Sequence, residues 1–382
     1  MSAPEAATAQ PTAAAGVGGR VAGPPGRWLR AGGQRPWWVW AVPFVLVFTV
    51  LVVRSRFLFT VRFYEQDDAA ANSILIEQAK HFTLLVGDYS RERFNHPGPA
   101  YMYVQALGEW LFLDLLHLVP TAWNAHVLAV FALNSAFVAM MVGVVYGWTR
   151  SLRGAAVCLA VVLGCVATEP WILSYDWMPW MYVPAYIAFV IAAASVAAGG
   201  ARDIWIATLT GWFLIHGHVC FLFFVPVILA TVLAAVMWRY GPRVALRRFA
   251  RPRTWVPAAA ISAVFALPIV VNLVLHWPGD FGKYLSYGSS KFAGGHGLPQ
   301  DLHYVLWYWW RGGGGWAAWL VPAVSYLVAV AVVRLCRGPL RRFLVALLVV
   351  NLVSTLAFLC YTAVGIDVLS EPYIGYFYFS AP

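Results

Sequence analysis

Charged residues are scarce in this chain. Aspartate, glutamate, lysine and arginine make up 11% of its 382 residues, whereas hydrophobic residues make up 61%. The mean hydropathy of +0.70 is too high for a soluble domain of this length. The composition therefore predicts a polytopic membrane protein.

Two familiar signals are also missing. The five cysteines lie in or beside apolar stretches, with no CxxC pair and no metal-ligand spacing, so we interpret them as small core residues. A cleaved signal peptide needs an apolar stretch close to the start, but the first one begins only at Trp37. Residues 1–36 are rich in Ala, Gly and Pro and lack the apolar mass to fold, so we expect a disordered cytoplasmic tail.

The apolar stretches predict an all-α polytopic membrane protein with about nine transmembrane helices. The expected spans are 37–53, 122–148, 155–171, 182–199, a hairpin over 204–238 that turns near His216, 255–276, 316–333 and 343–364. The stretch 97–118 is long enough to cross, but it carries Glu109 and Asp114, which are costly in hydrocarbon. We therefore expect a juxtamembrane amphipathic helix there, lying in the outer interface.

The charges fit one orientation, with the N-terminus in the cytoplasm. It places 17 of the 26 Lys and Arg inside with two acids, and the other 14 acids outside. The net charge of +10 is thus explained by membrane orientation, and we expect no nucleic-acid partner. The transmembrane domain is expected over 37–364, in the cell (plasma) membrane, with a first outer loop at 54–121 and a second at 277–315. An outer segment, 365–382, follows; it ends in YIGYFYFSAP, which looks like the start of another span, so we expect a truncated sequence.

The first outer loop is the most unusual part of the chain, because it is both charged and aromatic. Five acids lie within about thirty residues: Glu65, Asp67, Asp68, Glu77 and Asp88. Asp67 and Asp68 form an adjacent pair in YEQDDAAANS, and FNHPGPAYMY follows at 94–103. We interpret this loop as a catalytic loop held by the membrane-embedded remainder.

These two motifs and the predicted topology resemble the GT-C superfamily of membrane glycosyltransferases, which includes protein O-mannosyltransferases and lipid A aminoarabinose transferases. The resemblance covers about residues 37 to 280. This chain departs from the family pattern in two places: it has Asp-Asp where Asp-Glu is usual, and Gly98 displaces the second proline of the later motif. The subfamily stays open.

The resemblance implies transfer of a sugar from a polyprenyl-phosphate donor to a glycan, lipid or protein acceptor of the cell envelope, on the outer face. Asp67 is then the expected general base, with Asp68 supporting it or binding the acceptor. A loop that is merely solvated by these acids is the alternative. Arg91, Arg93 and His96, before a helix N-terminus, are expected to bind the donor phosphate, or else the two arginines contact lipid headgroups.

Weaker candidates for substrate contacts are Glu65, Asp176, His216, His218, Lys283 and Lys291. No metal site is assigned, although Glu65, Asp67 and Asp68 have oxygens that a divalent cation would accept, and no other cofactor is expected. Two other function classes stay open, a transporter or flippase for a lipid-linked glycan and an inactive truncated scaffold homologue. A transporter would show polar residues near the midplane and inverted repeats. Neither is visible here, which favours the enzyme.

Overall fold

The computed structural model describes residues 35–291, 296–311 and 315–380. In these ranges every regular element is helical, and one isolated β-bridge joins Tyr89 and Asn95. The prediction of an all-α protein is confirmed. Most of the expected N-terminal tail lies outside the described residues. The α-helices are α1 (Trp38–Arg54), α2 (Asp67–Lys80), α3 (Ala100–Gly108), α4 (Ala122–Thr149), α5 (Leu152–Thr168), α6 (Trp171–Ser174), α7 (Met178–Ala197), α8 (Ile204–Gly217), α9 (Phe221–Tyr240), α10 (Pro242–Phe249), α11 (Pro252–His276), α12 (Gly279–Lys291), α13 (Leu298–Trp307), α14 (Trp316–Leu335) and α15 (Gly338–Gly365).

Six of the described helices are long and apolar enough to cross a membrane: α4, α7, α9, α11, α14 and α15. The other three predicted spans form α1, α5 and α8, which are shorter. Helix α8 has 14 residues, so it reaches about 21 Å, less than the ~30 Å of hydrocarbon. The predicted helical hairpin is present, because α8 ends at Gly217 and α9 begins at Phe221.

Helix α7 is the centre of the bundle. It is almost entirely buried and packs against α4, α8, α9 and α15. Its second half, IAAASVA, is rich in alanine, which lets neighbouring backbones approach closely. By contrast, α11 exposes Val264, Leu267 and Val274 at 68%, 62% and 77%. An apolar helix with such an exposed surface needs lipid or another apolar partner.

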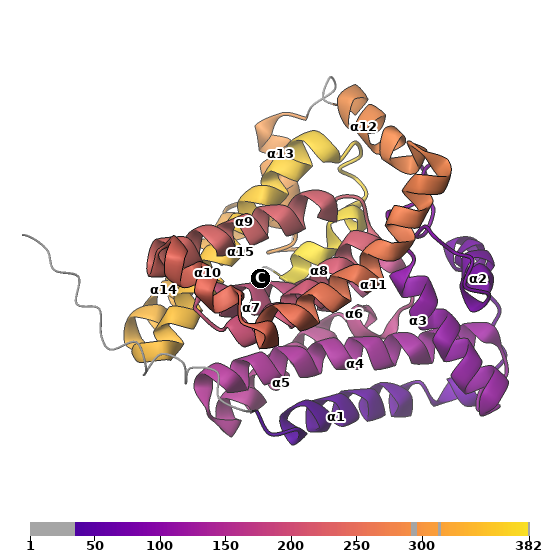
Figure 1. Ribbon diagram of the computed structural model, residues 1–382, viewed down its shortest axis with the longest axis horizontal. Helices are drawn as coiled ribbons and strands as arrows, with labels where there is room; N and C mark the ends of the chain where they lie inside the picture. The colour runs from indigo at the N-terminus through magenta and orange to yellow at the C-terminus, as the bar shows by residue number, and fades with distance from the viewer. Residues whose placement is uncertain (1–34, 292–295, 312–314, 381–382) are drawn as a thin grey trace, which may run out of the picture.

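One end of the bundle carries the loop elements. In Figure 1, α2, α3 and α12 gather at one end, while α10 lies at the other. Helices α1 and α4 run antiparallel, since Trp40 near the start of α1 meets Gly143 near the end of α4. We call the end that holds α2 and α3 the loop end.

The opposite end is fixed by a buried ion pair. Arg35 donates to both carboxylate oxygens of Asp203, at 2.5 and 2.8 Å, and the hydroxyl of Ser195 donates to the same carboxylate. Arg35 precedes α1 and Asp203 precedes α8, so this two-point contact holds the starts of the two helices next to each other.

The stretch 97–118 contains two helical parts, α3 and the π-helical segment η3 (Glu109–Leu115). Glu109 is buried, and its two oxygens contact Lys80 at 2.5 Å and His126 at 2.9 Å. Asp114 lies 3.3 Å from the same lysine. Glu109 and Asp114, whose charges made a membrane span unfavourable, both contact Lys80 of α2.

The C-terminal aromatic residues do not extend as another long helix. They form the 3₁₀ helix η5 (Pro372–Ser380), which packs against α7. Phe377 and Tyr378 are buried, and the Tyr378 hydroxyl donates to Thr355 at 3.0 Å. The aromatic segment is thus packed against α7 and α15.

Candidate functional site

A cavity of about 340 Å³ lies at the loop end. It is lined by the start of α2, the loop after it, the start of α7, the α8–α9 turn and the segment that follows α15. We call it the first cavity. The lining side chains with evident chemistry are Asp68, Asp88, Arg91, Glu92, His96, His218 and Asp367.

A short hairpin over residues 87–96 carries four of these groups. It is closed by hydrogen bonds from Gly87 N to His96 O at 2.9 Å and from His96 N to Asp88 O at 2.8 Å. Arg93 adopts a positive φ of 63° at its turn. The hairpin therefore places the backbones of Asp88 and His96 side by side.

The FNHPGPAYMY motif contacts the α8–α9 turn directly. His216 accepts a hydrogen bond from Ala100 N through Nδ1 at 3.2 Å and donates from Nε2 to Phe265 O at 2.9 Å. His96 Nδ1 accepts a bond from Val219 N at 3.3 Å. The HPGP loop is thus docked on the α8–α9 turn, and both nitrogens of His216 are used for structure.

Gly98 is explained by the same contact. A Cβ at this position would lie 2.3 Å from Nδ1 of His216. The glycine at position 98 therefore has a steric reason, because any side chain there would displace the imidazole.

His96 and His218 pack together, with ring centroids 4.2 Å apart. Burial lowers the pKa of His96 well below its usual range, and the neighbouring His218 lowers it further. Burial also lowers the pKa of His218 to about 4. Each ring accepts a main-chain N–H bond through Nδ1, so each neutral ring carries its proton on Nε2. The first cavity is therefore lined by two neutral imidazole donors.

Asp68 is held on the rim of the first cavity. It accepts hydrogen bonds from the Tyr89 hydroxyl and from Trp177 Nε1, both at 2.9 Å. It lies in the first turn of α2, where the helix dipole favours a negative charge. Asp68 is thus positioned as a carboxylate that faces the cavity.

Asp88 lies deeper in the first cavity. Burial raises the pKa of this carboxyl well above its usual range, and the charge of Asp68 raises it further. A carboxylate with a raised pKa accepts a proton more readily than an ordinary one. Asp88 therefore has the properties of a proton acceptor.

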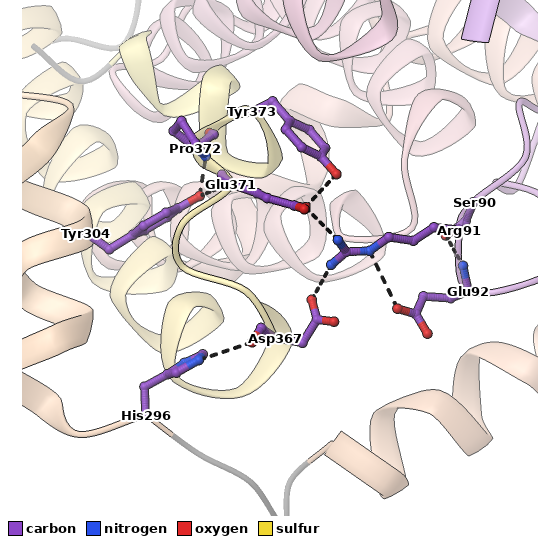
Figure 2. Close-up of polar contacts among 9 residues, drawn as sticks. All are labelled: Ser90, Arg91, Glu92, His296, Tyr304, Asp367, Glu371, Pro372 and Tyr373. Atoms are coloured by element: carbon purple, nitrogen blue, oxygen red, sulfur yellow. Dashed lines mark hydrogen bonds and ion pairs between the residues drawn. The ribbon is translucent and has the colours of Figure 1, made fainter. Parts of the chain in front are cut away.

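Arg91 joins the first loop to the segment after α15. Figure 2 shows its guanidinium between Asp367 and Glu371, with both of which it forms ion pairs. Glu92 lies 3.6 Å from Nε. Because its charge is shared by these carboxylates, an incoming phosphate would have to compete for it.

The remaining predicted residues lie outside the first cavity. Asp67 is exposed at the start of α2 with a positive φ of 49° and is not part of the lining. Arg93 is exposed at the hairpin turn. Lys283 is exposed and pairs with Asp280 at 2.6 Å. Nothing is described for the side chain of Lys291.

Glu65 and Asp176 belong to a different cluster, behind the first cavity. Glu65 lies 3.9 Å from His126, which also contacts Glu109. Burial raises the pKa of Asp176 to about 6, with smaller effects from His126 and Glu65. Burial alone would raise the pKa of Glu109, but the bonds from His126 and Lys80 lower it. This cluster fixes α2 and α3 on the start of α4.

Metal binding has no geometric support in the part of the chain that the structure describes. No group of three His, Cys, Asp or Glu side chains there is placed to hold an ion. Glu65 and Asp68 also belong to separate clusters, so the three oxygen donors that the sequence suggested do not converge.

Asp88, Tyr89, Trp177 and Asp367 were not assigned to the site from the sequence. Asp88 was visible as one of five loop acids, but nothing local shows that it is buried. Asp367 follows α15, almost 300 residues from the loop that it contacts, so only the folded chain brings it there. 

Family models, curated proteins and solved structures were each compared with the chain, and none of them matches it.

Proposed function

We propose that this chain is a membrane glycosyltransferase that moves a sugar from a polyprenyl-phosphate donor to a cell-envelope acceptor on the outer face of the plasma membrane. The first cavity is the proposed reaction site. The observation that carries the proposal is that Asp68 and Asp88, two of the four carboxylates in the lining, converge there with two neutral imidazole donors and one arginine. The resemblance of the two loop motifs to the GT-C superfamily points the same way.

The chemistry needs a base, donors for the leaving phosphate and a place for a lipid. The acceptor oxygen attacks the anomeric carbon, and the bond from that carbon to the phosphate oxygen breaks. The polyprenyl phosphate leaves with the bonding electron pair, and a carboxylate takes the proton of the acceptor hydroxyl. Asp88 suits the last role because burial raises its pKa.

We assign binding of the polyprenyl phosphate to the hydrogen-bond donors of the first cavity. His96 and His218 offer Nε2–H groups without adding positive charge. Arg91 adds a cation once the phosphate competes with Asp367 and Glu371. In this assignment Asp68 orients the acceptor, and the base role that the resemblance implies for Asp67 is given to Asp88, because Asp67 lies outside the lining.

A lipid-linked donor is supported by a neighbouring apolar groove. The groove has a volume of about 620 Å³ and lies between α3, α8 and α11. Its lining includes Tyr103, Phe213, Phe265 and Leu267, together with His216. His216 is two residues from His218, which lines the first cavity, so one turn connects an apolar groove with the polar site.

The test is donor cleavage by the purified full chain in lipid nanodiscs. Polyprenyl-phosphate sugars are supplied singly, and the release of polyprenyl phosphate is followed by mass spectrometry. The proposal expects release in the wild-type protein and its loss in Asp88→Asn. Movement of an intact lipid-linked sugar across proteoliposome membranes without cleavage would instead establish a transporter.

A further inference from the structure

A second cavity lies beside the first. It has a volume of about 780 Å³, within the range of small-molecule sites. Helix α13 forms one wall and the segment 367–372 forms the other. Asp367 lines both cavities, so a single residue separates them.

The separating segment is held from both sides. On the first-cavity side, the Asp367 carboxylate pairs with Arg91. On the second-cavity side, His296 Nε2 donates to the main-chain oxygen of Asp367 at 3.3 Å, and the Tyr304 hydroxyl donates to Glu371 O at 3.2 Å. Figure 2 shows these contacts on opposite sides of the same segment. The second cavity is thus a built feature of the fold.

The charges of the second cavity exclude an anion as its preferred ligand. None of the described residues that line it is lysine or arginine. Asp367 is the one acid among the described lining residues, and it is already paired with Arg91, while the carboxylate of Asp301 is buried next to His296. Among the described lining residues a phosphate would meet the Asp367 carboxylate and no lysine or arginine, so a neutral ligand fits better.

The polar groups that remain suit hydroxyls. Gln300 uses its side-chain oxygen to cap α13, accepting from Gly297 N at 2.9 Å, which leaves its NH₂ group to donate. His303 is exposed and lines the cavity. Tyr304 and Trp307 add aromatic surface, which packs against the apolar faces of a ligand.

We propose that the second cavity binds the acceptor, a neutral hydroxyl-rich glycan whose reactive hydroxyl reaches past Asp367 into the first cavity. The role as acceptor site rests on the proposed transferase function. Glycan binding at α13 does not, because it needs no donor and no catalysis.

The test is protection of His303 from carbethoxylation by diethyl pyrocarbonate, read by mass spectrometry on the full chain in nanodiscs. The probes are maltose, N,N′-diacetylchitobiose and inorganic phosphate. At least one disaccharide is expected to protect His303 in a saturable way, while phosphate does not. His81, which is exposed on the far side of the first loop, is the internal control and stays reactive.

A matched pair of variants locates the bound sugar. Gln300→Ala removes a donor and is expected to raise the half-saturating sugar concentration about two- to tenfold. Leu298→Ala changes an exposed residue of α13 outside the cavity lining and leaves that concentration unchanged. Equal effects of the two variants would overturn the proposal, as would the failure of both disaccharides to protect His303.

Donor cleavage by the wild-type protein is measured in parallel. If a disaccharide protects His303 but no donor is cleaved, the transferase proposal is wrong and the glycan-binding proposal is supported. If the donor is cleaved but no disaccharide protects His303, the glycan-binding proposal is wrong and the transferase proposal is supported.

Discussion

The imidazoles of His96 and His218 lie 4.2 Å apart, although 122 residues of chain separate them. One comes from the hairpin of the first loop and the other from the α8–α9 turn. Both are neutral at pH 7, because burial lowers the pKa of each ring. This packing joins the loop to the helical bundle and sets the donor character of the first cavity.

The pair predicts a loss of stability in acid. The pKa of His218 is about 4 in the folded chain and about 6.5 when unfolded. Between these values the unfolded state binds more protons, so the stability falls as the pH drops from 6.5 towards 4. His96 acts in the same direction.

Thermal unfolding in nanodiscs between pH 7.5 and 4.5 measures this effect. Between pH 7.5 and 4.5, the Tm of His218→Gln is expected to fall less than the Tm of the wild-type protein. His81→Gln, which changes an exposed histidine, is expected to leave the profile as it is. Parallel profiles for all three proteins would show that the buried pair does not titrate on unfolding.

Three substitutions distinguish the roles of Asp67, Asp68 and Asp88. Asp88→Asn is expected to lower kcat about 10²- to 10⁴-fold, the usual contribution of a general base. Asp68→Asn loses the charge at the rim and is expected to raise the acceptor KM. Asp67→Asn is the matched control, because its side chain is exposed outside the cavity lining. An inactive Asp67→Asn beside an active Asp88→Asn would return the base role to Asp67, as the sequence suggested.

Arg91 and Arg93 offer a second comparison on one hairpin. Arg91→Ala removes the cation of the first cavity, so the donor KM is expected to rise about tenfold or more. Arg93→Ala changes an exposed turn residue outside the lining and is expected to alter the donor KM less than threefold. Similar effects of both substitutions would indicate a general surface attraction for anionic lipid instead of a phosphate site.

Gly98→Ala tests how the HPGP loop docks. Its Cβ would collide with the His216 ring, so the substitution is expected to cost about 1–3 kcal/mol of unfolding free energy, as overpacking usually does. In Gly164→Ala the new methyl group meets nothing within 4 Å, and helix propensity favours alanine there. The contrast is measured by thermal unfolding, and an equally stable Gly98→Ala would show that the loop is docked differently.

Helix positions were predictable because apolar stretches bounded by basic turns leave few alternatives. The stretch 122–148 became α4, Ala122–Thr149, and the turn near His216 separates α8 from α9. The count of nine spans was less secure, since α8 continues for only 14 residues. The aromatic C-terminus was hard to interpret because burial against α7 depends on tertiary contacts.

The candidate site was predictable in part. Asp68, Arg91, His96 and His218 were selected from the sequence and line one cavity. The role of His216 was not predictable, because only the folded chain shows that Ala100 and Phe265 use both its nitrogens. Asp88 gains its raised pKa from burial, which a polar hairpin sequence does not reveal.

The most direct test of the central claim is a density map of the full chain with a polyprenyl-phosphate sugar bound. The account predicts the phosphate in the first cavity, within hydrogen-bond distance of Nε2 of His96 or His218, and the prenyl chain in the groove between α3, α8 and α11. A phosphate bound at the opposite end of the bundle, near the Arg35–Asp203 ion pair, would contradict it.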